Sequence, residues 1–152
     1  MASRLAKSEV TEILMKQFDT EMVIPLNSNY FHVEGITNGT ALYVSQSKPS
    51  SHSKGNWSYL FFHTVTEIVL ERVLFGSGRL VLLNYINKNC IILNAADIAW
   101  AIRHSSRKKK KGENEEYVTD FVVNRYDNGK FYLESYNRYS NLKRTVCISQ
   151  FN

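Results

Sequence analysis

The chain has 152 residues, enough for one domain with one core, and 43% of them are apolar, which excludes a disordered chain. No apolar run approaches the roughly 20 residues of a membrane-spanning helix, and the N-terminus lacks the apolar stretch of a secretory signal. We therefore expect a protein without membrane contact that is cytoplasmic, or nuclear in a eukaryotic cell.

The net charge of +5 comes from one basic run, which consists of Arg107, Lys108, Lys109, Lys110 and Lys111. Because the chain has 19 basic and 14 acidic residues, the sequence outside this run is neutral. Such a run can bind phosphates through counterion release. It is equally typical of a solvated loop, and in a eukaryotic cell it could act as a nuclear address.

The first predicted element is an amphipathic helix that begins near Ser3 or Ser8, with Ser8 as a candidate cap. Its apolar residues recur at helical spacing, namely Val10, Ile13, Leu14 and Phe18. Pro25 ends this region. A β-hairpin is then expected from residues 30–36 and 41–46, because Asn-Gly between two β-rich runs is a strong hairpin signal.

Residues 57–62 predict a third strand, and a short helix then begins at Thr64 or Thr66 and ends at Gly76 or Gly78. The nearly all-apolar residues 79–85 predict a strand buried on both faces. Residues 90–93 predict another strand. A helix over residues 95–102 follows, with Asn94 as its cap and Asp97 at its third position.

The last third of the chain predicts three strands after a polar loop at residues 105–116. Residues 117–125 and 130–136 form a hairpin, and residues 142–149 form the final strand. The whole order predicts a single α/β (α+β) domain over residues 1–152. It has a mixed central sheet, an N-terminal helix and two further short helices.

Several classes of enzyme lack their motifs here. The sequence has no Gly-rich phosphate loop, no His-Glu-x-x-His and no Gly-x-Ser-x-Gly, and its four histidines are scattered. Cys90 and Cys147 each lie in an apolar stretch, where a thiolate is costly. We expect both cysteines to be reduced core residues.

One pattern could carry chemistry. The first hairpin arm bears His32 and Glu34, which are expected on opposite faces, and the second arm ends in Gln46-Ser47-Lys48, with Gln46 and Lys48 on one side. A carboxylate on one arm is thus expected to face an amide and an ammonium on the other. Such a cluster suits metal-assisted phosphodiester cleavage, in which carboxylates hold Mg²⁺ and the lysine positions the attacking water.

From about residue 8 to residue 98 the layout resembles the PD-(D/E)XK nuclease-like superfamily of restriction and repair enzymes. The matching elements are the helix with Glu9 and Glu12, the hairpin arm Val33-Glu34-Gly35-Ile36, the strand end Gln46-Ser47-Lys48, and the late pair of strands before a helix. The resemblance implies a nuclease-like core over about residues 8–104, followed by C-terminal strands at residues 117–149.

The sequence departs from the superfamily pattern at two positions. The first arm offers His32 or Glu34 where an aspartate is usual, and Gln46 replaces the usual glutamate. The implied catalytic set is Glu34, Gln46 and Lys48, and the implied metal set is Glu34, Gln46 and Glu12. Each residue also has a plain interpretation: Lys48 as a solvated strand end, Glu34 as an exposed strand residue, and Glu12 as a favourable charge near a helix N-terminus.

Two functions follow. The first is a nuclease-like DNA-binding domain, a Mg²⁺-dependent endonuclease (hydrolase), with the basic run on phosphates. The alternative is a non-catalytic binding or inhibitor module of a mobile element that engages nucleic acid or an acidic protein. Tyrosines interleaved with basic residues after residue 117 suit a nucleic-acid surface, but tyrosines also favour strands in general. DNA is favoured over RNA as partner, and a homodimer is a further expectation.

Overall fold

The computed structural model describes residues 4–19, 22–34, 40–48, 50–52, 57–104, 108–109, 117–137 and 142–147. Its helices are α1 (Lys7–Phe18), α2 (Glu67–Phe75) and α3 (Ala95–His104). Its strands are β1 (Val23–Pro25), β2 (Tyr30–Val33), β3 (Thr40–Ser47), β4 (Ser50–His52), β5 (Trp57–Tyr59), β6 (Phe61–Thr66), β7 (Arg79–Asn84), β8 (Asn89–Leu93), β9 (Lys108–Lys109), β10 (Tyr117–Arg125), β11 (Phe131–Asn137) and β12 (Leu142–Cys147). Within those ranges no helix has the length and apolar character needed to cross a membrane.

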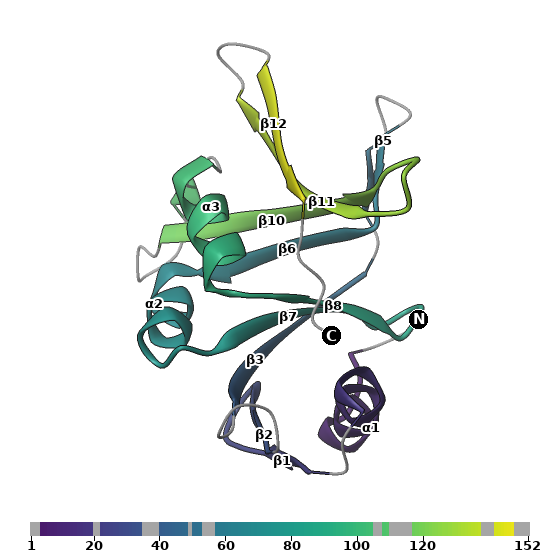
Figure 1. Cartoon of the computed structure of the whole chain (residues 1–152), viewed down its shortest axis with the longest axis vertical. Coiled ribbons are helices and arrows are strands. Elements are labelled where there is room, and N and C mark those ends of the chain that lie inside the picture. The colour runs from purple at the N-terminus through teal and green to yellow at the C-terminus, as the bar shows by residue number, and fades with distance from the viewer. Residues whose placement is uncertain are drawn as a thin grey trace.

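Two sheets form the body of the fold, which is α+β as predicted. The mixed sheet has the order β1-β2-β3-β7-β8, in which β3 and β7 run parallel and the other neighbours antiparallel. The antiparallel sheet has the order β12-β11-β10-β6, and β9 pairs with the start of β10. Figure 1 shows β6 and β10 above the mixed sheet, α1 below it, and α2 and α3 together at one end. The strands β4 and β5 form a separate pair.

The apolar stripe of α1 covers one face of the mixed sheet, which confirms the predicted amphipathic helix. Val10, Leu14 and Phe18 are buried against a sheet face made by Val33, Leu42, Val44, Val81 and Leu83. The expected cap is wrong. Ser8 lies inside the helix, and Ala6 occupies the N-cap position without a side-chain hydrogen bond.

Strand β7 is buried on both faces, as its sequence predicts, because alternate side chains enter two different cores. Val81 and Leu83 point towards α1, whereas Leu80 and Leu82 enter the core between the two sheets. That second core also contains Phe121 of β10, and α2 and α3 close it. The C-terminal strands are therefore part of the main core.

The structure differs from the predicted elements where short pieces pair with distant strands. The expected strand at 57–62 divides at Leu60 into β5 and β6. The helix α2 has Thr66 and Gly76 as its two caps, which agrees with the prediction. Strand β1 was not predicted, and it lies at a sheet edge, where Pro25 is tolerated. Residues 108–109 fall within the predicted loop but form the strand β9, because their backbone pairs with β10.

The N-terminus of α3 carries the predicted capping box. The Asp97 N–H donates to Asn94 Oδ1 at 3.0 Å, and the Asn94 N–H donates to Asp97 Oδ2 at 3.2 Å. Asn94→Ala should lower the free energy of unfolding by about 1 kcal/mol, measured by urea denaturation. Asn94→Ser keeps a capping oxygen and should retain most of the stability. An equal loss of stability in both variants would show that the capping oxygen is not the cause of the stabilisation.

Candidate functional site

The structure does not bring Glu34 together with Gln46 and Lys48. In the β2–β3 ladder, Val33 pairs with Thr40, so Glu34 lies at the turn end of the hairpin. Gln46 and Lys48 lie at the other end of β3. At about 3.3 Å per residue, Thr40 and Gln46 are about 20 Å apart. The expected site across the hairpin is therefore not formed, because strand alternation fixes the face of a residue but not its position along the ladder.

Glu34 has a different partner, His32. The His32 Nε2 lies 2.8 Å from Glu34 Oε1, so the two side chains share one face of the strand. The expectation that they lie on opposite faces is wrong, since residues two apart in a strand point the same way. The pair is partly exposed, and the Glu34 N–H donates to the carbonyl oxygen of Met22 beside β1.

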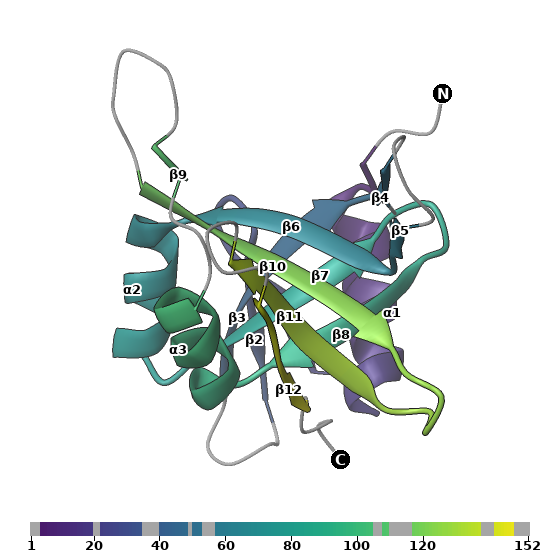
Figure 2. The ribbon, with the colours of Figure 1, turned by 90° about the horizontal axis from the view of Figure 1, so that it is seen from above.

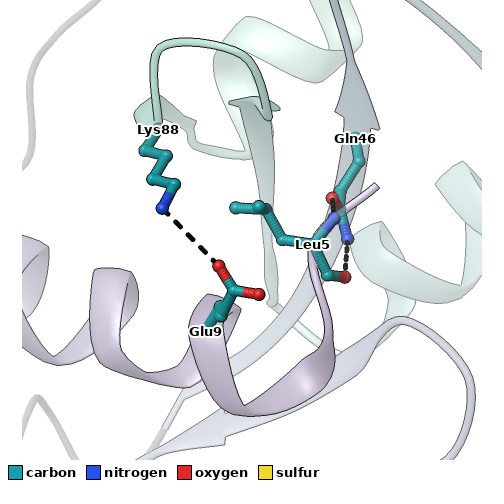
Figure 3. A network of polar contacts seen from close by, with 4 residues as sticks. All are labelled: Leu5, Glu9, Gln46 and Lys88. Carbon is teal, nitrogen blue, oxygen red and sulfur yellow. Dashed lines mark hydrogen bonds and ion pairs between the residues drawn. The ribbon is translucent and has the colours of Figure 1, made fainter. Parts of the chain in front are cut away.

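Gln46 uses its amide to hold the N-terminal segment. Its Oε1 accepts the Leu5 N–H at 2.7 Å, and its Nε2 donates to the Leu5 carbonyl oxygen at 3.1 Å (Figure 3). This pair of bonds occupies the atom that was expected to ligate a metal. It also fixes the chain next to Arg4.

The helix glutamates belong to another surface. Glu9 Oε2 lies 3.7 Å from the Lys88 Nζ on the turn after β7 (Figure 3). Glu9 and Glu12 both line a hollow of about 510 Å³. Lys16 and Lys88 line it too, and their positive charges offset those of the two carboxylates. Neither glutamate is near Glu34. Among the described residues, no group of three or more His, Cys, Asp or Glu side chains could hold a metal ion.

The cysteines and the basic run complete the predicted residues. Burial raises the pKa of the Cys90 thiol to about 12, so it is an unreactive thiol at the edge of the α1 core. Cys147 is exposed, which corrects its expected place in the core. Arg107, Lys110 and Lys111 lie outside the described residues, and Lys108 and Lys109 are described only as the backbone of β9.

A polar cleft of about 350 Å³ lies between β3 and β6, and we call it the β3–β6 cleft. Its described lining consists of Arg4, Asn29, Tyr43, Ser45, Gln46, Ser47, Phe62, His63 and Thr64. Strand β3 runs beneath β6, the edge strand of the antiparallel sheet (Figure 2). The cleft opens near the carboxyl end of β3, which runs parallel to β7, and ligands of open α/β sheets commonly bind at such strand ends.

A hydrogen-bonded Ser–His pair forms the inner wall of the cleft. Ser45 Oγ lies 2.9 Å from His63 Nδ1, and His63 is only 2% exposed. Burial lowers the pKa of His63 to about 4, so the ring is neutral at pH 7. A base with so low a pKa activates a hydroxyl poorly. Among the described residues, no carboxylate hydrogen-bonds to this ring to raise its basicity.

The charge of the cleft is positive. Arg4 supplies a guanidinium, and none of the described lining residues is acidic. Thr64 Oγ1 donates a hydrogen bond to Asp120 Oδ1 at 2.7 Å across the β6–β10 ladder. The cleft thus offers Arg4 and several hydroxyl and amide groups to a ligand, and it suits an anion rather than a cation.

The sequence reasoning missed this cleft, although a pattern pointed to it. His63 lies on the inward face of β6 between two buried apolar residues of the same face, Phe61 and Val65. Burying a polar side chain at such a position costs free energy unless the side chain forms hydrogen bonds, so a buried histidine there is a sign of a polar partner or of a functional site. Arg4 belongs to no local sequence pattern, and the contact of its neighbour Leu5 with Gln46 holds this segment beside the cleft.

Comparison with known proteins finds no matching family model, no matching curated protein and no matching solved structure. The resemblance to PD-(D/E)XK nucleases therefore rests on the sequence pattern alone and stays a prediction.

Proposed function

We propose that this chain is a non-catalytic binding module that takes a phosphate-bearing ligand, with nucleic acid as the main candidate, in the β3–β6 cleft. The observation that carries the proposal is the lining, which combines the Arg4 guanidinium with hydroxyl and amide groups and has no acidic residue among its described members. Guanidinium groups bind phosphate oxygens through two parallel hydrogen bonds. A lining with carboxylates would repel the same ligand.

Two contacts favour binding over catalysis. The Ser45 hydroxyl faces a histidine whose pKa is lowered to about 4 by burial, so proton transfer to it is weakly driven at neutral pH. The Gln46 amide is held in place by two hydrogen bonds to the Leu5 backbone. The cleft therefore has groups that can hold an anion, and its most reactive-looking residues have structural partners.

Arg4→Gln is the direct test. With an end-labelled single-stranded oligonucleotide and fluorescence anisotropy, the variant should bind about tenfold more weakly than the wild type, because a charge-assisted hydrogen bond is lost. The slope of log affinity against log salt concentration should also fall by about one, since one phosphate contact releases about one counterion.

Arg103→Gln is the matched control. Arg103 is exposed on α3, at the end of the sheets away from the N-terminal segment (Figure 2). This variant should keep the affinity and the salt slope of the wild type. If Arg4→Gln and Arg103→Gln bind alike, or if the wild type does not bind, the proposal fails.

The basic run requires a separate experiment, because the sequence predicts that it contacts phosphate by itself. Replacing Lys108–Lys111 with serine removes that contribution and leaves the cleft in place. The Arg4→Gln effect should persist in this background, since the two sites add independently. Loss of the Arg4 effect there would assign the binding to the run and overturn the role of the cleft.

Incubation with Mg²⁺ or Mn²⁺ separates this proposal from metal-dependent cleavage. The sequence resemblance predicts cleavage that disappears in Lys48→Ala, whereas a binding module leaves the oligonucleotides intact. Metal-dependent cleavage by the wild type, lost in Lys48→Ala, would overturn the non-catalytic part of the proposal.

A further inference from the structure

We infer that the β3–β6 cleft takes one unpaired nucleoside phosphate, with its base against the ring of Tyr43 and its phosphate at Arg4. The inference rests on the proposed function, because it names the unit of ligand that the same cleft binds. It predicts a preference for single strands over duplexes and a tolerance for any base.

An aromatic side chain of β3 borders the cleft. Tyr43 is a partly buried member of the lining, whereas the ring of Phe62 on β6 lies on the strand face opposite to His63. The Tyr43 ring contacts the Tyr30 ring edge-on, with centroids 5.0 Å apart and an interplanar angle of 67°. Arg72 of α2 lies over the Tyr30 ring in turn. These contacts restrict the Tyr43 ring, so little side-chain entropy is lost when a base packs on it.

The cation lies at one end of the same cleft. The Gln46 amide clamps Leu5 to the end of β3, and this places Arg4 among the lining residues. Tyr43 stands three residues before Gln46 on the same strand. An aromatic wall with a guanidinium at one end matches a ligand that has a flat apolar part and an anionic part. A nucleoside phosphate has both, whereas inorganic phosphate has only the second.

The size of the cleft favours a single unpaired unit. Its volume of about 350 Å³ is near the lower end of the range for small-ligand sites, roughly 300–1,000 Å³. In a duplex the base faces are stacked inside and only the base edges reach the grooves. A base must therefore leave the stack before its face can meet Tyr43, which costs a few kcal/mol in a duplex and much less in a single strand.

The test compares four ligands on the full chain: dAMP, inorganic phosphate, a short single-stranded deoxyadenosine oligonucleotide, and the duplex of that oligonucleotide. The single strand should bind at least about tenfold more tightly than the duplex. Tyr43→Leu should weaken single-strand binding by roughly tenfold, because one stacking contact is lost. Tyr43→Phe keeps the ring and should bind like the wild type.

A second measurement follows the NMR signals of the ligand, so that a change in the stability of a protein variant is not mistaken for a loss of stacking. The adenine protons of dAMP should shift upfield in NMR titrations with the wild type and with Tyr43→Phe, owing to the ring currents of a stacked aromatic. The shift should be reduced in Tyr43→Leu. The comparison matters because Tyr43 also packs against the core between the sheets.

The outcomes distinguish this inference from the proposed function. The inference is overturned if Tyr43→Leu binds like the wild type and the duplex binds like the single strand. The proposed function still stands in that case, provided that Arg4→Gln binds weakly. If Arg4→Gln has no effect on any ligand, the proposed function itself fails. Upfield shifts with dAMP support the inference. If dAMP binds as tightly as the oligonucleotide, the ligand of the cleft is a free nucleotide. If dAMP binds more weakly, the ligand is a nucleotide within a single strand.

Discussion

Lowering the pH from 7 to 4 should remove on the order of 3 kcal/mol from the free energy of unfolding through His63 alone. Burial lowers the pKa of this histidine from 6.5 to about 4 in the folded chain. In the unfolded chain the ring titrates at its ordinary value. The measurement is a series of urea denaturation curves at pH values across this range.

The sign follows from proton counting. Between pH 6.5 and about pH 4 the unfolded chain binds a proton on His63 and the folded chain does not, so acid favours unfolding. Arg4 lines the same cleft, and none of the described lining residues is an acid that could offset a second positive charge. Asp97 acts in the opposite direction, because burial raises its carboxyl pKa and the folded chain then binds the extra proton.

His63→Gln isolates the effect. Glutamine can still hydrogen-bond to Ser45 but does not titrate, so the loss of stability between pH 6.5 and pH 4 should become much smaller. His32→Gln is the control, since the His32 side chain is 32% exposed and belongs to a different surface. That variant should keep the wild-type loss. Identical pH profiles for the wild type and His63→Gln would contradict the assignment.

The features predicted correctly from the sequence are those that neighbouring residues determine. The Asn94–Asp97 capping box spans three positions, and the β10–β11 hairpin turns at Gly129, whose φ of +80° favours glycine. The buried strand β7 is visible in its all-apolar run. Each of these patterns has one physical cause that acts within a few residues.

The pairing of distant strands could not be predicted in this way. Nothing local in β3 indicates that Leu42 pairs in parallel with Arg79, or that β6 pairs with β10. The error about Glu34 has the same origin. Glu34 follows Val33, which pairs with Thr40, so its distance from Gln46 depends on the register of the hairpin and not on any local pattern.

The candidate site was missed because it is assembled from three segments far apart in the sequence. Arg4, Ser45 and His63 come from the N-terminal segment, β3 and β6, and each contributes one group to the cleft. The site predicted from the sequence was built around carboxylates, since these are the usual ligands of Mg²⁺. The cleft instead combines a cation with neutral polar groups, a composition that no short motif describes.

Gly78→Ala should lower the free energy of unfolding by about 1–3 kcal/mol, because the added Cβ has no room. Gly78 is buried at the junction of α2 and β7, and a Cβ there would lie 2.7 Å from the carbonyl oxygen of Ala41 and 3.4 Å from that of Val73. Both neighbours are backbone atoms. The Ala41 carbonyl can move only if the start of β3 moves, and β3 carries the wall of the cleft.

Gly76→Ala, two residues earlier, is the matched control for this prediction. A Cβ at Gly76 would meet only the Arg72 carbonyl oxygen at 3.5 Å, an ordinary contact, and the backbone φ of −84° is accessible to alanine. Its stability should be unchanged or should rise by up to about 1 kcal/mol, because alanine restricts the unfolded chain. Urea denaturation at pH 7 measures both variants. Equal losses would mean that the junction tolerates a side chain at Gly78, and that β3 is not held in place by close backbone contact with α2.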